Sequence, residues 1–212
     1  MIHAYDEIYL PLARRNLASM LDYAVYDLNF NIIDFFELFI NSKYSKRFEM
    51  GDFSVLAGMS GIELAVRVIE EYDNLDFYPD ASGTIERSQE YWLGYYLTYY
   101  QWYSNKRFLD IVRYISIEEL LSLYSPYHEM DVMQFVDKVN EIISLRQSIT
   151  NLKRIRLERK ITQKQLAEIS KIPLRTIQQY EQKQKDINKA SAINLFVLTQ
   201  ALKCDIRDIL EI

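Results

Sequence analysis

The residues with the clearest chemistry lie in one nine-residue stretch, LRTIQQYEQ, at 174–182. Arginine can donate two hydrogen bonds to guanine O6 and N7, and glutamine can pair with adenine N6 and N7. Residues three and four apart share one side of a helix. If the stretch is helical, its outer face carries Leu174, Arg175, Gln178, Gln179 and Gln182. The residue types and their spacing predict a surface that reads bases in the major groove of DNA.

Two short helices joined by a tight turn are needed to present this face. The first helix begins at Thr162, whose hydroxyl can cap it while Gln165 reaches back in a capping box. Pro173 then interrupts the helical period, because proline is tolerated at a helix start but not in the interior. Ile172 and Ile177 are expected to bury the turn and the inner face of the second helix. The pattern therefore predicts a helix-turn-helix arrangement.

Further helices complete a five-helix module at 149–212. We expect one at about 149–160, a long one at about 188–203 and a short one at the end of the module. Gln163 and Lys164 open the first helix of the pair, where backbone N–H groups and the helix dipole favour a phosphate. The module holds 13 Lys and Arg against 7 Asp and Glu, a net charge of +6. A small basic module is a candidate for binding a polyanion.

The pattern of this module is similar to the XRE, or Cro/phage-repressor, helix-turn-helix family. The matching positions are Ile161-Thr162-Gln163, Leu166-Ala167, Ile172-Pro173, Thr176-Ile177 and Glu181. The resemblance implies that Gln163 contacts phosphate and that Arg156 and Glu181 form an internal salt bridge. With the neighbouring polar residues, the expected DNA-binding set is Gln163, Lys164, Leu174, Arg175, Thr176, Gln178, Gln179, Gln182 and Lys183.

Two positions depart from that family. Lys171 stands where glycine is frequent, and Pro173 stands where a serine or threonine cap is frequent. The start of the second helix, and the base contact expected of Leu174, are therefore less well defined. The lysines of the following loop, Lys183, Lys185 and Lys189, can either reach phosphates or form a solvated turn.

Residues 1–148 have the opposite charge and no comparable motif. They hold 12 Lys and Arg against 23 Asp and Glu, a net charge of −11. Apolar residues recur at three- and four-residue spacing, and no Asn-Gly or Asp-Gly turn occurs. The sequence therefore predicts an all-α chain, with an acidic helical domain at 1–148 and the helix-turn-helix domain at 149–212. The junction is expected to be either a helix end or one continuous helix.

An aromatic run, YWLGYYLTYYQWYS, spans 91–104 of the acidic domain. A helix that is apolar on nearly every side is normally buried, but tyrosine hydroxyls also suit a half-wet interface. The run is interpreted as a core helix, a partner surface or a ligand pocket. The candidate partner residues are Tyr91, Trp92, Tyr95, Tyr99 and Trp102. Gly94 would let another backbone approach closely.

Residues able to carry catalysis, or to bind a metal or cofactor, are sparse. The chain has one cysteine, Cys204, and two histidines, so no clustered metal-ligand set is expected. His128 beside Glu129 and Asp131 is a weak candidate for metal or acid–base chemistry. The glycines of GDFSVLAGMSG fit no nucleotide-binding fingerprint. We therefore expect no enzyme activity, no cofactor, no membrane insertion and a cytoplasmic location.

The acidic domain also resembles the front half of XRE-type regulators in bacterial toxin–antitoxin-like loci. The segments that carry this resemblance are LDYAVYDLNFNIIDFFELFINS, FEMGDFSVLAGMSGIELA and the aromatic run. It implies a dimeric antitoxin that represses its own operon through an operator in double-stranded DNA and masks a toxin protein with its acidic domain. The alternative is a repressor that responds to a ligand or peptide bound in a pocket of that domain.

Overall fold

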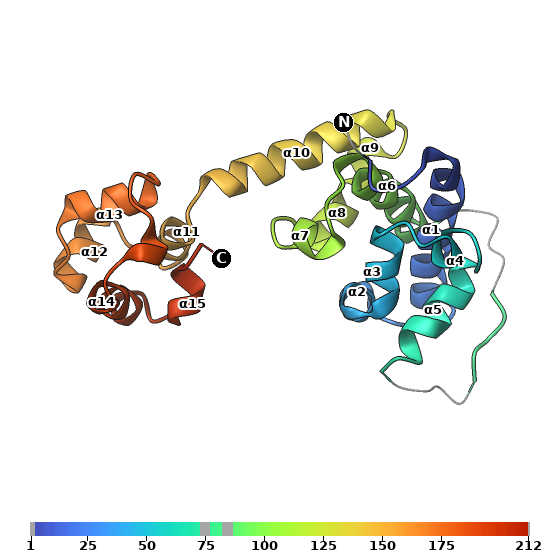
Figure 1. Ribbon diagram of the computed structural model, residues 1–212, viewed down its shortest axis with the longest axis horizontal. Helices are drawn as coiled ribbons and strands as arrows, with labels where there is room; N and C mark the ends of the chain where they lie inside the picture. The colour runs from blue at the N-terminus through green and yellow to red at the C-terminus, as the bar shows by residue number, and fades with distance from the viewer. Residues whose placement is uncertain (1–2, 73–76, 82–86, 212) are drawn as a thin grey trace. The chain divides into compact units, whose positions relative to one another are not determined.

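The computed structural model describes residues 3–72, 77–81 and 87–211. All regular secondary structure in this part of the chain is helical, which confirms the expected all-α fold (Figure 1). The chain divides into two compact units, Met1–Ile143 and Ser144–Ile212. The division falls inside helix α10 (Val132–Ser148), and α11 begins at Asn151, so the junction contains a helix end.

The first unit is built from one 3-10 helix and a set of α-helices, several of them very short. Its elements before α10 are η1 (Glu7–Tyr9), α1 (Leu10–Tyr26), α2 (Ile32–Asn41), α3 (Lys43–Glu49), α4 (Phe53–Leu56), α5 (Gly61–Ile69), α6 (Gln89–Ser104), α7 (Phe108–Val112), α8 (Ile117–Ser122) and α9 (Tyr124–Tyr127). Helix α1 follows η1 directly and ends at Tyr26.

Helix α1 is the centre of this unit, and α5 and α6 pack along it (Figure 1). Two glycines set how close these helices come. A Cβ atom added at Gly94 of α6 would lie 2.6 Å from the Cα atom of Ala18, and one added at Gly61 of α5 would lie 2.7 Å from Cβ of Ser19. Because both spaces are too small for a methyl group, the backbones approach as expected for Gly94.

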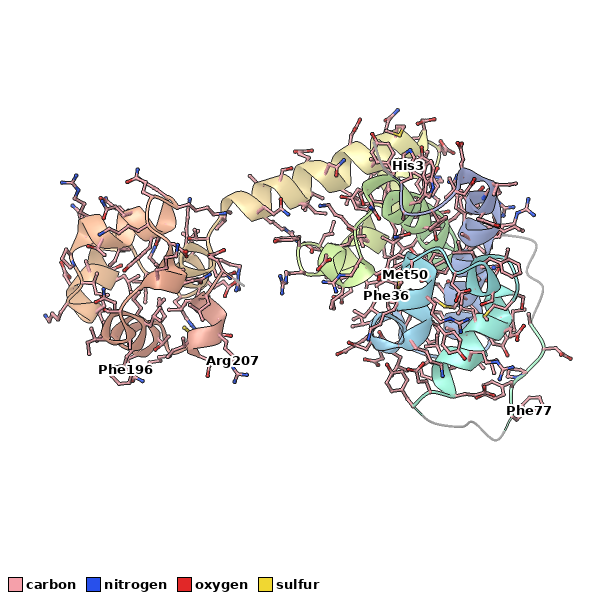
Figure 2. The ribbon with its side chains drawn as sticks, viewed as in Figure 1. His3, Phe36, Met50, Phe77, Phe196 and Arg207 are labelled. Carbon is pink, nitrogen blue, oxygen red and sulfur yellow. The ribbon has the colours of Figure 1, made fainter. Side chains whose placement is uncertain are left out.

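The aromatic run forms α6 and is mainly core. Trp92 and Trp102, two of the five candidate partner residues, are buried inside the unit and belong to its core. The Trp92 ring packs edge-on against Phe135 of α10, and Trp102 Nε1 donates to the backbone oxygen of Tyr5 at 2.8 Å. The His3 ring stacks on Trp102 with 3.9 Å between ring centres (Figure 2).

A row of tyrosines on the same helix stays half-buried. It consists of Tyr91, Tyr95 and Tyr99, which lie four residues apart. The Arg14 guanidinium of α1 lies 3.7 Å from the centre of the Tyr95 ring, and its Nε donates to the Tyr95 backbone oxygen. This cation–π contact ties the row to the fold and leaves one side of it exposed.

Serine side chains cap helices α5 and α8 of this unit. Ser116 and Glu119 form a capping box at the start of α8. Ser60 caps α5 by accepting from the backbone N–H of Glu63, but the Glu63 carboxylate faces Arg67 at 3.7 Å. Only half of a capping box is therefore formed at Ser60.

The second unit has its own core. Its elements after α10 are α11 (Asn151–Glu158), α12 (Gln163–Ser170), α13 (Leu174–Glu181), η2 (Ile187–Lys189), α14 (Ala192–Leu202) and α15 (Ile206–Ile209). Each contributes apolar side chains to one buried cluster, including Leu152, Leu166, Ile177, Leu198 and Ile209. The shared core fixes the positions of α12 and α13 within the unit.

Replacing Gly94 with alanine is expected to destabilise the first unit by about 1–3 kcal/mol, because overpacking against Ala18 outweighs a gain of ~1 kcal/mol in helix propensity. Both tryptophans of the chain lie on α6, so tryptophan fluorescence during urea unfolding reports on this unit alone. Gln89→Ala, at an exposed position of the same helix, is the control and should be nearly neutral. Equal stability of the two variants would contradict the close crossing.

Candidate nucleic-acid interface

Helix α12 is fixed at its start by the capping box expected from the sequence. Thr162 Oγ1 accepts from the backbone N–H of Gln165 at 3.2 Å, and Gln165 Oε1 accepts from the backbone N–H of Thr162 at 2.8 Å. The backbone N–H groups of the first turn remain directed out of the helix end, where an anion is favoured. Lys164 in this turn is exposed.

The turn between α12 and α13 is made by residues that are unusual for it. Ser170 Oγ donates to the Leu166 oxygen at 2.6 Å and accepts from the backbone N–H of Ile172 at 3.3 Å. Lys171 follows with φ at 59°, the left-handed region that favours glycine. Pro173 precedes α13 and gives no side-chain cap, as its chemistry predicts. The buried Ile172 side chain anchors the turn, as expected.

Helix α13 presents one face to its own unit and one to solvent. Ile177, Tyr180 and Glu181 are buried. Arg175 is exposed, as is Gln182 just after the helix. Between these extremes lie the half-buried residues Leu174, Thr176, Gln178 and Gln179. The structure thus brings the predicted base-reading residues together on one accessible helix face.

Arg156 and Glu181, which the resemblance implies to be an ion pair, are in contact. Arg156 Nε and Nη2 donate to the two Glu181 carboxylate oxygens at 2.6 and 2.9 Å, and Nη1 donates to the Ile161 backbone oxygen at 2.8 Å. Their side chains are only 8% and 1% exposed. This two-point contact joins α11, the start of α12 and the end of α13.

Two predicted DNA contacts have partners within the unit that the sequence did not reveal. Gln163 Nε2 donates to Glu181 Oε2 at 2.8 Å, so this side chain is held by the ion pair. Lys183 Nζ donates to the Gln147 backbone oxygen at 2.6 Å. Neither bond follows from local spacing, because the residues are 18 and 36 positions apart. The ion pair therefore fixes the orientation of the Gln163 side chain. The Lys183 ammonium already makes one hydrogen bond to the end of α10.

The surface around α12 and α13 is cationic. Lys164, Lys171, Arg175 and Lys183 are all exposed. From 161 to 185, Glu168 is the only carboxylate apart from the buried Glu181. A cationic surface around polar side chains is the arrangement expected for phosphate contacts beside base contacts.

A family model described as helix-turn-helix, HTH_3, matches residues 152–209. Residues 152–209 form a helix-turn-helix domain of the XRE type. The match supports a DNA-binding transcription regulator. It covers only this domain; no curated protein and no solved structure matches the chain.

Outside the helix-turn-helix domain, the described residues contain neither a clustered metal-ligand set nor a helix that could span a membrane. No group of three or more His, Cys, Asp or Glu residues in this part of the chain could hold a metal ion. His128 contacts Glu129 at 3.7 Å on the surface and has backbone oxygens near its Nδ1. No helix in the same residues is long and apolar enough to cross a membrane.

Replacing Lys171 with glycine is expected to stabilise the helix-turn-helix domain by about 1 kcal/mol, because a side chain with a positive φ is strained. Lys171→Ala removes the same charge but keeps the strain, so it should give no such gain. Urea unfolding followed by far-UV circular dichroism measures both. A stabilisation of equal size in both variants would assign the effect to charge instead.

Arg156→Met is expected to cost about 3–5 kcal/mol, because it leaves the buried Glu181 carboxylate without its cation. The double variant Arg156→Met with Glu181→Leu should cost less than the two single changes together. The unfolding free energy of the domain, compared across the four proteins, measures this coupling. Additive losses would show that the two side chains stabilise the domain independently.

Proposed function

We propose that the chain is a sequence-specific DNA-binding regulator that reads its operator with α13. The observation that carries this proposal is the accessible α13 face, with Arg175 exposed in its first turn, on a domain that matches the helix-turn-helix family model. Arg175 supplies a contact to guanine, and Gln178, Gln179 and Gln182 supply amides for adenine. Lys164 and the first turn of α12 bind the phosphate backbone on one side of the groove.

The regulator acts as a dimer in this proposal. Helix-turn-helix dimers bind half-sites about 34–36 Å apart, one turn of DNA, on the same face of the duplex. Ile193 and Phe196 of α14 are exposed large apolar residues three positions apart. They supply a self-complementary contact in this dimer; Phe196 is labelled in Figure 2. The half-buried tyrosine row of α6 supplies a second surface for a copy or a partner.

Arg175→Ala is expected to cost about 1–3 kcal/mol at one base position and to relax specificity there. Lys164→Ala should weaken binding to all sequences alike and reduce the salt dependence by about one charge. The measurement is fluorescence anisotropy of the full chain on an operator obtained by selection from random duplexes. Arg207→Ala is the matched control, because Arg207 is exposed on α15, which packs on α11 and α14 (Figure 2). Failure of the selection to yield a preferred duplex would refute sequence-specific binding.

The finer proposal is that this regulator is an antitoxin. Two properties of the chain support it: the opposite charges of residues 1–148 and 149–212, and the resemblance of the first part to regulators of toxin–antitoxin-like loci. The acidic unit binds a toxin protein, and the basic domain represses the shared operon. Because the chain folds as two compact units, the two activities belong to different units.

Co-expression with the product of the adjacent reading frame tests the antitoxin role. The two proteins are expected to co-purify as one complex, and the chain should restore growth that the partner inhibits. Arg175→Ala should keep the complex and the growth rescue while losing repression, because α13 belongs to the other unit. A chain that purifies without the partner, and does not restore growth, would contradict the antitoxin role while leaving operator binding intact.

A second candidate function is a repressor that responds to a small ligand. One observation favours it: a cavity of about 460 Å³ in the acidic unit, beside the C-terminal end of α6. Ligand pockets typically have volumes of about 300–1,000 Å³. The cavity lies at the end of the aromatic helix and not along its tyrosine row.

A further inference from the structure

The cavity of the acidic unit is formed by Ala4 before η1, by α3 and Met50 directly after it, by the end of α6 and by the segment that leads into α7. The side chains that matter for its chemistry are Lys46, Glu49, Met50, Gln101, Lys106 and Arg107. All of them belong to the first compact unit, so the cavity is complete within it. Neither the helix-turn-helix domain nor the tyrosine row contributes to its wall.

One side chain that lines this cavity has a buried amide oxygen without a partner. Gln101 is 1% exposed, and its Oε1 has no hydrogen-bond partner among the described residues. An unsatisfied buried polar atom destabilises a fold, so its presence needs a reason. A ligand N–H or O–H group would satisfy Oε1 once the Gln101 side chain turns its amide toward the cavity.

The rim of the cavity is cationic. Lys46 and Lys106 form no ion pair with any carboxylate in the described part of the chain, whereas Arg107 is held by Asp110 at 2.8 and 2.9 Å. Glu49 is the one carboxylate in the wall, and its Oε1 accepts from the backbone N–H of Phe108 at 2.6 Å. With Arg107 already paired to Asp110, the two lysines outnumber the single wall carboxylate, which favours an anionic group within a unit that is otherwise acidic.

An apolar contact completes the wall. Met50 is 82% exposed and lies beside the rim of the cavity. Its flexible thioether can adapt to ligands of different shape. Burial of Glu49 raises the pKa of its carboxyl, which reduces its repulsion of an approaching anion as pH falls.

From this geometry we infer that the cavity binds a small organic acid: a carboxylate held by Lys46 and Lys106, an N–H or O–H group donating to Gln101 Oε1, and a short apolar part against Met50. This inference names the ligand class for the second candidate function. It rests on that function only for an effect of the ligand on DNA binding. Binding of the acid itself depends on the first unit alone.

Three probes separate the contributions. N-acetyl-phenylalanine carries the carboxylate, the N–H donor and an apolar ring; 3-phenylpropionate lacks the donor; N-acetyl-phenylalanine methyl ester lacks the charge. The measurement is titration of the full chain followed by ¹H–¹⁵N NMR. We expect saturable shifts of the Gln101 side-chain amide and of the Asn105 and Lys106 backbone amides, with the two truncated probes about fivefold weaker or more. Equal binding of the three probes, or no saturable shift up to about 20 mM, would overturn the inference.

Variants test the assigned roles. Gln101→Leu should weaken N-acetyl-phenylalanine about fivefold and leave 3-phenylpropionate unchanged, because 3-phenylpropionate lacks the N–H donor. Lys106→Gln and Lys46→Gln should weaken both acids and leave the methyl ester unchanged. Lys43→Gln, on the exposed surface of the same helix as Lys46, is the matched control. If Lys43→Gln weakens the acids as much as Lys46→Gln, the effect is one of overall charge and the assigned site is wrong.

Operator affinity is measured with and without saturating N-acetyl-phenylalanine. This measurement tests the ligand-responsive repressor separately from ligand binding. A changed affinity supports the ligand-responsive repressor. Unchanged affinity with saturable NMR shifts counts against that function, while the organic-acid site stands on its own result.

Discussion

The helix-turn-helix domain depends on one buried ion pair. Arg156 of α11 holds both oxygens of Glu181 at the end of α13 and the backbone oxygen of Ile161 before α12. Because Glu181 also accepts from Gln163, the same carboxylate orients the first residue of α12. A buried charge pair is costly to break, so these elements move as one body. The α13 face and the phosphate-binding start of α12 therefore keep a fixed relation, which reading a DNA groove requires.

The acidic unit depends on a different constraint, the closeness of its backbones. Gly94 and Gly61 bring α6 and α5 against α1, and no side chain larger than hydrogen fits at either crossing. This closeness buries Trp92 and Trp102 and turns most of the aromatic run into core. What remains for partners is the tyrosine row beside Arg14, which is half-buried and fixed by cation–π contact. A rigid aromatic row of this kind suits an interface, because little conformational freedom is lost on binding.

Lysine takes an unusual structural role in the basic domain. Lys160, Lys171, Lys183 and Lys203 each have positive φ at or just after the end of a helix, where glycine is common. Positive charge at a helix C-terminus is favourable, which offsets part of the backbone strain. These lysines also add to the positive charge of the domain. Helix termination and attraction to DNA are thus supplied by the same residues, at some cost in stability.

Local sequence determined much of this protein. The capping box at Thr162, the break at Pro173 and the three- and four-residue periods predicted the helices, because each depends on residues a few positions apart. The charges of the two parts and the Arg and Gln spacing of α13 likewise follow from sequence alone. Tertiary structure decided what depends on distant contacts: the burial of Trp92 and Trp102, the bond from Gln163 to Glu181, and the Lys183 contact with Gln147. It also decided that Gln101 and Lys46, 55 positions apart, line one cavity. Periodicity shows which side of a helix is apolar, but only packing determines what that side meets.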